Sequence, residues 1–309
     1  MYVLAGYSRP QPNLNGERQV ADGQPTDGTE SDGQPADGTE SNNAQPETNA
    51  SRWTRLLDRW PWLPFFLPLI VYFAVHSFVP KPPNPEAGPS WWVGFAYEHY
   101  PIIYTIKIAL TLASVIFVWP GIRRFEFRVR PEAFLVGILG IFVWVGLCSL
   151  RLEQTIFDKL GLGFLIDKLG LGFLIDMGAR SGFNPLEQLQ ATPAWAWGFL
   201  GIRFLGLVLL VPIMEEFFWR GFLWRFIQEP DDWATQPFGS WDRAAAILTT
   251  LAVMLAHPPG EWLAALVWFS LVTWLMLRTK NIWDCVVAHA VTNLLLGVYV
   301  LSTNNWHLM

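Results

Sequence analysis

The sequence has little charge, few cysteines and no basic surplus. Charged residues are 15% of its 309 residues, whereas a typical soluble domain has about 25%. Its 21 Lys and Arg against 26 Asp and Glu give a net charge of -5, which excludes a nucleic-acid binder because no basic surface is left for phosphates. Cys148 and Cys285 both lie in apolar runs, so a disulfide-stapled secreted fold is excluded. We also expect no signal peptide, because the N-terminus lacks a basic stretch followed by an apolar core.

Hydrophobic residues are abundant, and the negative charge is confined to one end of the chain. Hydrophobic residues make up 52% of the sequence, which includes 18 Trp and 22 Phe. Residues 1–50 carry a net charge of -6 and contain a ten-residue unit written twice, Asp22–Ser31 and Asp32–Ser41. Such a polar segment buries too little apolar surface to offset the entropy of ordering. We expect a disordered acidic tail over residues 1–50 and a multi-span membrane domain over residues 51–309.

Apolar segments follow one another from Arg52 onward. A helix needs about 20 apolar residues to cross roughly 30 Å of hydrocarbon. The two segments between residues 244 and 277 are short, and a break with two prolines separates them at residues 257–260. We therefore expect an all-α fold, a polytopic transmembrane helix bundle of about seven to eight spans. The predicted spans are Trp62–Val79, Ile102–Gly121, Ala133–Leu150, Ala194–Met214, Ala244–Ala256, Trp262–Leu277 and Ile282–Leu301.

The basic residues of short loops predict the orientation of this bundle. Lys and Arg concentrate in the cytoplasmic loops of membrane proteins. Here they cluster before the first span and between the second and third, at Arg52, Arg55, Arg59, Arg123, Arg124, Arg128 and Arg130. We expect a multi-pass protein of the cytoplasmic (inner) cell membrane, embedded in the lipid bilayer, with its N-terminal tail in the cytoplasm.

Two adjacent acids stand at the end of the fourth predicted span. A charge at mid-membrane costs about 2.5 to 3.5 kcal/mol even on lenient insertion scales, so each one needs a reason. In a helix, Glu216 and Arg220 are four residues apart and share a face, so they can pair. Glu215 points elsewhere and lacks that partner, and a desolvated carboxylate without a partner suits general-base catalysis. The structural alternative is that both glutamates mark the membrane boundary beside Arg220.

Two further polar motifs lie in the later apolar segments. His257 follows an apolar run and precedes Pro258-Pro259. His289 and Asn293 are four residues apart, so they share one face of the last span, and both can donate hydrogen bonds. Each feature alone also fits a hydrogen-bonded structural residue or a polar helix-packing pair.

Together the three motifs contain the parts that peptide-bond hydrolysis needs. A carboxylate can activate water, an imidazole can orient it, and two donors can hold the oxyanion. No covalent nucleophile is required, and no G-x-S-x-G sequence occurs.

The order of these residues resembles a known family. Glu215-Glu216-x-x-x-Arg220, then His257, then His289-x-x-x-Asn293 look like the three motifs of the type II CAAX prenyl endopeptidase and bacteriocin-processing (CPBP) family of intramembrane glutamate proteases. The resemblance covers roughly residues 190–300, a protease core within the membrane domain. The short sequences Val211–Glu216 and His257–Trp262 resemble those of the branch of that family associated with exosortase (PEP-CTERM) systems.

The resemblance implies a role for each residue. Glu215 would be the base that polarises water, with His257 helping to hold that water. His289 and Asn293 would form the oxyanion site, while Glu216 and Arg220 would support them. The substrate would be a membrane-associated protein or peptide cut near its C-terminus. One departure is that Val253 stands where the family usually has Phe, which bears on the shape of the pocket.

Two alternatives stay open at this stage. Glu215, His257 and His289 also make a His₂Glu set, the ligand type of several zinc peptidases, although no H-E-x-x-H sequence occurs. We expect no cofactor, with zinc as the alternative. The chain could also be a non-catalytic membrane immunity or assembly factor that keeps these residues for packing.

Overall fold

The computed structural model describes residues 50–82, 94–161 and 182–308. The acidic tail predicted to be disordered therefore lies outside the described residues, apart from Ala50. All regular secondary structure in the described part is helical, as the sequence predicts. The main helices are α1 (Ala50–Arg59), α2 (Leu63–His76), α3 (Tyr100–Ile122), α4 (Pro131–Leu150), α5 (Leu152–Lys159), α7 (Pro185–Gln188), α8 (Pro193–Phe204), α9 (Val211–Glu216), α10 (Trp224–Gln228), α11 (Arg243–Ala256), α12 (Trp262–Thr279) and α13 (Ile282–Thr303).

Five helical stretches of the described residues are long and apolar enough to cross a membrane. They are Tyr97–Ile122, Pro131–Lys159, Pro193–Gln228, Pro259–Thr279 and Ile282–Thr303. The helices α2 and α11 are apolar but have only 14 residues each. All seven predicted segments are thus helical, five of them within stretches long enough to span and two as shorter apolar helices, and the count of seven to eight spans stays a prediction. This arrangement is consistent with a multi-pass membrane protein.

The short helix α11 begins and ends where local chemistry requires it. The side chain of Asp242 accepts a hydrogen bond from the Ala245 amide at 2.7 Å and so caps the start of α11. At the other end, α11 stops before Pro258, because a residue that precedes proline is disfavoured in helical conformation. The turn Pro259–Glu261 then leads directly into α12. The predicted break at residues 257–260 is confirmed, and it places His257 at the end of a helix.

A tight turn also joins α12 to α13. Lys280 adopts a left-handed conformation, with φ of 51°, and ends α12. Asn281 then caps α13, because its side-chain oxygen accepts a hydrogen bond from the Trp283 amide at 3.1 Å. The two long helices are therefore antiparallel neighbours, which fixes the side chains of one against the other.

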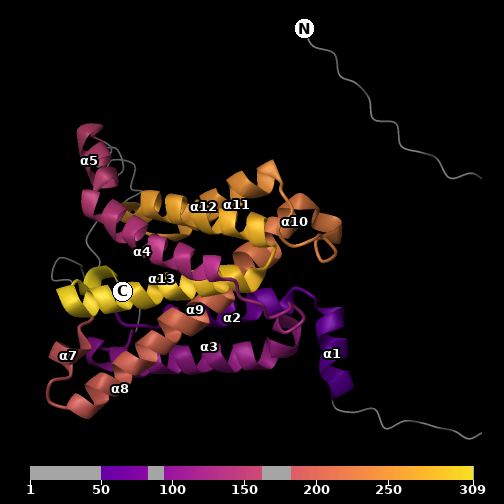
Figure 1. The fold of residues 1–309 in the computed structure, drawn as a ribbon. Helices are drawn as coiled ribbons and strands as arrows, with labels where there is room; N and C mark the ends of the chain where they lie inside the picture. The colour runs from indigo at the N-terminus through magenta and orange to yellow at the C-terminus, as the bar shows by residue number, and fades with distance from the viewer. Residues whose placement is uncertain (1–49, 83–93, 162–181, 309) are drawn as a thin grey trace, which may run out of the picture. The chain divides into compact units, whose positions relative to one another are not determined.

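Helix α13 lies in the middle of the bundle (Figure 1). It packs against α4 and α12 on one side and against the stretch from Leu205 to Glu216 on the other. Two glycines of α4 permit the closest approach, because a Cβ at Gly137 would lie 2.6 Å from the Cβ of Val291, and one at Gly140 would lie 2.5 Å from Oγ1 of Thr292. Small residues let membrane helices pack backbone to backbone in this way.

The fourth predicted span is much longer than the sequence suggested. It runs from Pro193 to Gln228 without a break, so the predicted end at Met214 is wrong, and Glu215 and Glu216 lie within the helix rather than at its end. The helix continues because the charge of Glu216 is neutralised by Arg220, one turn further on, and because aromatic residues follow. Two stretches of this helix, Leu205–Leu210 and Phe217–Leu223, are π-helical.

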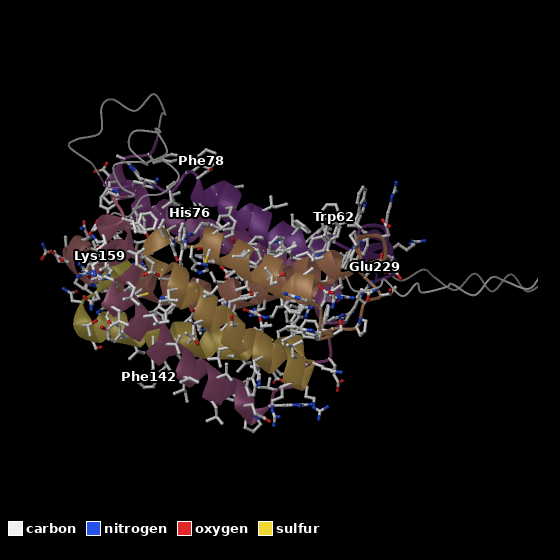
Figure 2. The ribbon with its side chains drawn as sticks, turned by 90° about the horizontal axis from the view of Figure 1, so that it is seen from above. Trp62, His76, Phe78, Phe142, Lys159 and Glu229 are labelled. Carbon is white, nitrogen blue, oxygen red and sulfur yellow. The ribbon has the colours of Figure 1, made fainter. Side chains whose placement is uncertain are left out.

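The bundle has two distinct ends. Trp62 and Glu229 lie near one end, and His76 and Lys159 lie near the other (Figure 2). The short helix α1 and helix α10 lie at the first end, and α5 and α7 lie at the second (Figure 1). The glutamate pair stands between the two ends, along the axis of the bundle.

Candidate active site

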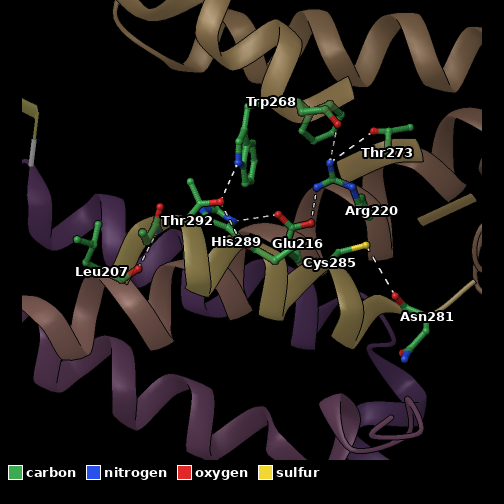
Figure 3. A network of polar contacts seen from close by, with 12 residues as sticks. Leu207, Glu216, Arg220, Trp268, Thr273, Asn281, Cys285, His289 and Thr292 are labelled. Atoms are coloured by element: carbon green, nitrogen blue, oxygen red, sulfur yellow. Dashed lines mark hydrogen bonds and ion pairs between the residues drawn. The ribbon is translucent and has the colours of Figure 1, made fainter. Parts of the chain in front are cut away.

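Glu216 is the centre of a buried polar network (Figure 3). Its side chain is 1% exposed. One carboxylate oxygen, Oε2, pairs with Nη1 of Arg220. The other, Oε1, lies 2.9 Å from Nδ1 of His289. Both oxygens are therefore occupied by protein donors, which suits a structural or orienting residue better than a base that takes a proton from water.

Arg220 ties this network to α12. Its side chain is fully buried, and Nη2 donates to the carbonyl of Phe269 at 3.0 Å and to Oγ1 of Thr273 at 3.4 Å. Its Cζ atom lies 3.9 Å from the centroid of the Phe269 ring, close enough for a cation–π contact. The predicted pairing of Glu216 with Arg220 is present, and the helical spacing of four residues brings it about.

Glu215 has a different environment from its neighbour. It is only partly buried, and within the described part of the chain its carboxylate makes no hydrogen bond and no ion pair. It lies close enough to His289 and His257 to interact electrostatically with both. The two adjacent glutamates are therefore distinguished by their contacts, and within the described residues only Glu216 has both oxygens engaged by protein donors.

The contact with Glu216 determines which nitrogen of His289 is available. A carboxylate oxygen only accepts hydrogen bonds, so Nδ1 of His289 carries the proton in this contact. The other ring nitrogen, Nε2, is left for water or a substrate. His289 is 6% exposed, so its ring orientation is set by the protein and not by solvent.

His257 is held in a similar way by the backbone. Its Nδ1 lies 2.8 Å from the carbonyl oxygen of Val253, and because a carbonyl only accepts, Nδ1 donates and Nε2 is left. The carbonyl of His257 in turn accepts a hydrogen bond from Nε1 of Trp262 at 3.0 Å. Both histidines of the site therefore bind the protein through Nδ1 and keep Nε2 for other partners.

Asn293 is linked to the first π-helical stretch. Its Nδ2 donates to the carbonyl of Leu207 at 2.9 Å. The wider turns of a π-helix change the pairing of backbone groups, and here the Leu207 carbonyl accepts a side-chain hydrogen bond across to α13. One of the two amide hydrogens of Asn293 is used in this contact, so only the second can serve an oxyanion.

The structure thus brings the predicted residues into two groups. Glu216, Arg220 and His289 form one network through direct contacts, and Glu215 lies near both histidines. Asn293 lies one turn beyond His289 on α13 and contacts the helix of the glutamates. Sequence reasoning missed the residues that surround them, above all Trp268, Thr273 and Thr292, because each stands in an apolar run with nothing in its spacing to mark it.

The residue types of the site also raise the question of a metal ion. Among the described residues, no group of three or more His, Cys, Asp and Glu side chains is placed to hold a metal ion. Glu215, His257 and His289 therefore do not assemble as the zinc ligand set that their residue types allow.

Residues 196–295 match the Rce1-like type II CAAX prenyl endopeptidase family. The match covers about a third of the chain and includes every predicted site residue. No curated protein and no solved structure matches the chain.

The matched family is a peptidase family, so this stretch of the chain is similar to a peptidase domain. CAAX endopeptidases act on proteins, so the match implies a protein substrate. The matched segment begins within α8 and ends within α13. It contains the π-helical stretches, the glutamate pair, the turn at His257 and the His289 face of α13, while α2, α3 and α4 lie outside it and pack around it.

Proposed function

We propose that the protein is an intramembrane endopeptidase that hydrolyses a peptide bond with water activated by Glu215. The observation that carries the proposal is the contrast between the two glutamates. Glu216 is engaged by Arg220 and His289, whereas Glu215 has no such partner and lies near two histidines. A carboxylate in this position, within a domain of a peptidase family, is suited to accept a proton from water.

In the proposed reaction, the carboxylate of Glu215 takes a proton from water while Nε2 of His257 helps to orient that water. The resulting hydroxide oxygen bonds to the carbonyl carbon of the scissile peptide, and the carbonyl oxygen becomes negatively charged. His289 and Asn293 stabilise that oxyanion by donating hydrogen bonds, His289 from Nε2 as an imidazolium whose Nδ1 donates to Glu216, and Asn293 from its second amide hydrogen. The carbon–nitrogen bond then breaks, and Glu215 returns the proton to the departing amine.

Glu216 and Arg220 act on this reaction through His289. Glu216 accepts from Nδ1 of His289 at 2.9 Å and so directs Nε2 of that ring away from itself. Arg220 neutralises Glu216 and is anchored to α12 through the Phe269 carbonyl. Such fixed donors are effective because they need no reorganisation when charge develops in the transition state.

The proposed substrate is a membrane-associated protein or peptide, cut near its C-terminus. The family name supports this class of substrate, including a prenylated one. We place the protein in the cytoplasmic membrane with its N-terminal tail in the cytoplasm, on the basis of its loop arginines. The finer assignment to an exosortase-associated branch rests on short sequence phrases alone.

The test compares the C-termini of membrane proteins in cells that make the wild-type chain or a variant. Glu215→Gln keeps the size of the side chain but removes the base, and Glu229→Gln, at an exposed position at the end of the same long helix, is the matched control. Mass spectrometry should find new protein C-termini with the wild type and with Glu229→Gln but not with Glu215→Gln. The same set of C-termini from all three would overturn the proposal.

The alternative function is that of a non-catalytic membrane assembly factor. The observation in its favour is that the Glu216 network joins three parts of the bundle through buried hydrogen bonds and an ion pair. A packing role predicts that Glu215→Gln either leaves the biological function intact or removes folded protein from the membrane. A catalytic role predicts a folded and inactive protein, so the amount of folded variant distinguishes the two.

A further inference from the structure

Trp268 of α12 lies against the imidazole of His289. The two ring centroids are 4.7 Å apart and the planes are inclined by 65°, an edge-to-face arrangement that aromatic rings favour. Trp268 is 6% exposed, and its Nε1 donates to Oγ1 of Thr292 at 3.2 Å. Because Thr292 follows His289 on α13 by three residues, the indole is fixed to α13 beside His289 (Figure 3).

The hydrogen bond to Thr292 is itself fixed by α4. Oγ1 of Thr292 lies 2.9 Å from the Gly137 carbonyl and 3.0 Å from the Ala288 carbonyl. A Cβ at Gly140 would lie 2.8 Å from Nε1 of Trp268 and 2.5 Å from Oγ1 of Thr292. Only glycine leaves room at this position, so three helices together determine where the indole of Trp268 lies.

A second tryptophan extends this contact to the other histidine. The ring of Trp144, one turn beyond Gly140 on α4, lies 6.3 Å from that of Trp268 at an angle of 87°. It also lies 5.4 Å from the ring of His257 at an angle of 62°. His257, Trp144, Trp268 and His289 therefore form a continuous row of edge-to-face contacts, which joins the two histidines near Glu215.

The row of aromatic rings restricts the tilt of the two imidazoles, which the hydrogen bonds alone do not. The hydrogen bond from Nδ1 of His289 to Glu216 fixes one edge of the His289 ring. The hydrogen bond from Nδ1 of His257 to the Val253 carbonyl fixes one edge of the His257 ring. Neither bond prevents the ring from tilting about that edge. A large indole packed against each ring restricts the tilt and so fixes the direction of Nε2.

We propose that Trp268 and Trp144 are positioning residues, which hold the imidazoles of His289 and His257 in the relative orientation that hydrolysis at Glu215 requires. This inference rests on the proposed endopeptidase function. The tryptophans act through the histidines and take no part in bond making or breaking. A loss of orientation should therefore lower the rate of the chemical step more than it weakens substrate binding.

The kinetic test uses full-length protein in lipid vesicles and an internally quenched farnesylated peptide that ends in a CAAX sequence. Trp268→Phe keeps a ring but loses the hydrogen bond to Thr292, and Trp274→Phe is the matched control, because Trp274 is 52% exposed on the same helix. We expect kcat to fall by about 10- to 100-fold in Trp268→Phe, with KM within about twofold of the wild type. The control should keep the wild-type kcat.

A second pair of variants covers the case in which Trp268→Phe fails to fold. Thr292→Val removes the acceptor for Trp268 with almost no change in volume, whereas Thr292→Ser keeps it. We expect Thr292→Val to lose kcat in the same way and Thr292→Ser to retain it. An unchanged kcat in a folded Trp268→Phe, or in Thr292→Val, would overturn the inference.

A spectroscopic measurement gives an answer that does not depend on activity. In protein labelled with ¹⁵N-histidine, Trp268→Phe should shift the ring signals of His289, assigned by their loss in His289→Ala. The signals of the exposed His307 should not move. Unshifted His289 signals would overturn the inference. A wild type that releases no new C-termini would instead overturn the proposed function, so the two failures are distinguishable.

Discussion

Nδ1 of His289 lies 2.9 Å from Oε1 of Glu216, and the other oxygen of the same carboxylate pairs with Arg220. One buried acid thus neutralises a permanent cation and orients a histidine at the same time. Its neighbour, Glu215, has neither contact. The helical spacing already distinguishes the two acids, because only Glu216 lies one turn from Arg220. The packing of α13 adds the contact between Glu216 and His289.

The first prediction concerns this separation. Glu216→Gln should destabilise the protein by about 3 to 5 kcal/mol, because it leaves the fully buried Arg220 without its counter-ion. Glu215→Gln should change stability by less than about 1 kcal/mol, because it removes no hydrogen bond or ion pair in the described part of the chain. Thermal unfolding of both variants in the same detergent checks the difference. Equal losses of stability would mean that the distinction between the glutamates is wrong.

The second prediction concerns Asn293. Asn293→Ala removes both the contact with the Leu207 carbonyl and the second amide hydrogen. If that hydrogen serves the oxyanion, kcat should fall by about 10² to 10³-fold, while the lost hydrogen bond should lower stability by only about 1 kcal/mol. Asn293→Asp is the informative companion, since a carboxylate there would repel the oxyanion. A variant Asn293→Asp with wild-type kcat would contradict the oxyanion role.

Much of the fold could be predicted from the sequence. Apolar segments of sufficient length predict helices directly, and all seven predicted segments are helical. The pair Glu216 and Arg220 was predictable because a spacing of four residues is a local property of a helix. The end of the fourth span was not predictable by counting apolar residues, because Glu216 is tolerated inside the bundle only through Arg220 on the same helix and His289 on α13.

The surroundings of the site depend on contacts between distant segments. Trp268 contacts Thr292 because glycines of α4 allow three helices to approach closely. Nothing in the spacing around Trp268 distinguishes it from the exposed Trp274 on the same helix. The sequence could therefore give the residues that carry the proposed chemistry, while the residues that hold them in place required the helix packing.

The third prediction concerns metal dependence. We expect the proposed reaction to use water activated by Glu215 and oriented by His257, with no metal ion. Cleavage by purified protein should keep its rate after treatment with 1,10-phenanthroline and dialysis. The control is dialysis without chelator, and metal content is measured in both samples. Loss of activity together with stoichiometric zinc, and its return when zinc is added, would overturn the metal-free proposal.

The fourth prediction concerns Lys107, a buried lysine on α3, away from the glutamate pair on α9. Its side chain is 1% exposed. Nζ lies 3.5 Å from Nδ1 of His76, and it lies 4.2 Å from the ring centroid of Tyr72 and 4.1 Å from that of Tyr104. It forms no ion pair with a carboxylate in the described part of the chain. Arg203 lies close enough to interact with it as a second positive charge.

Replacing this lysine by an apolar residue should therefore stabilise the protein. A lysine within a membrane costs about 2.5 to 3.5 kcal/mol on insertion scales, and cation–π contacts return about 0.5 to 2 kcal/mol. Lys107→Met should raise the free energy of unfolding by about 1 kcal/mol, and Lys159→Met, at an exposed position on α5, should leave it unchanged. Thermal unfolding of the three proteins checks this. A lower stability of Lys107→Met would mean that the two tyrosine rings and His76 outweigh the desolvation of the cation, and that Lys107 contributes to holding α2 against α3.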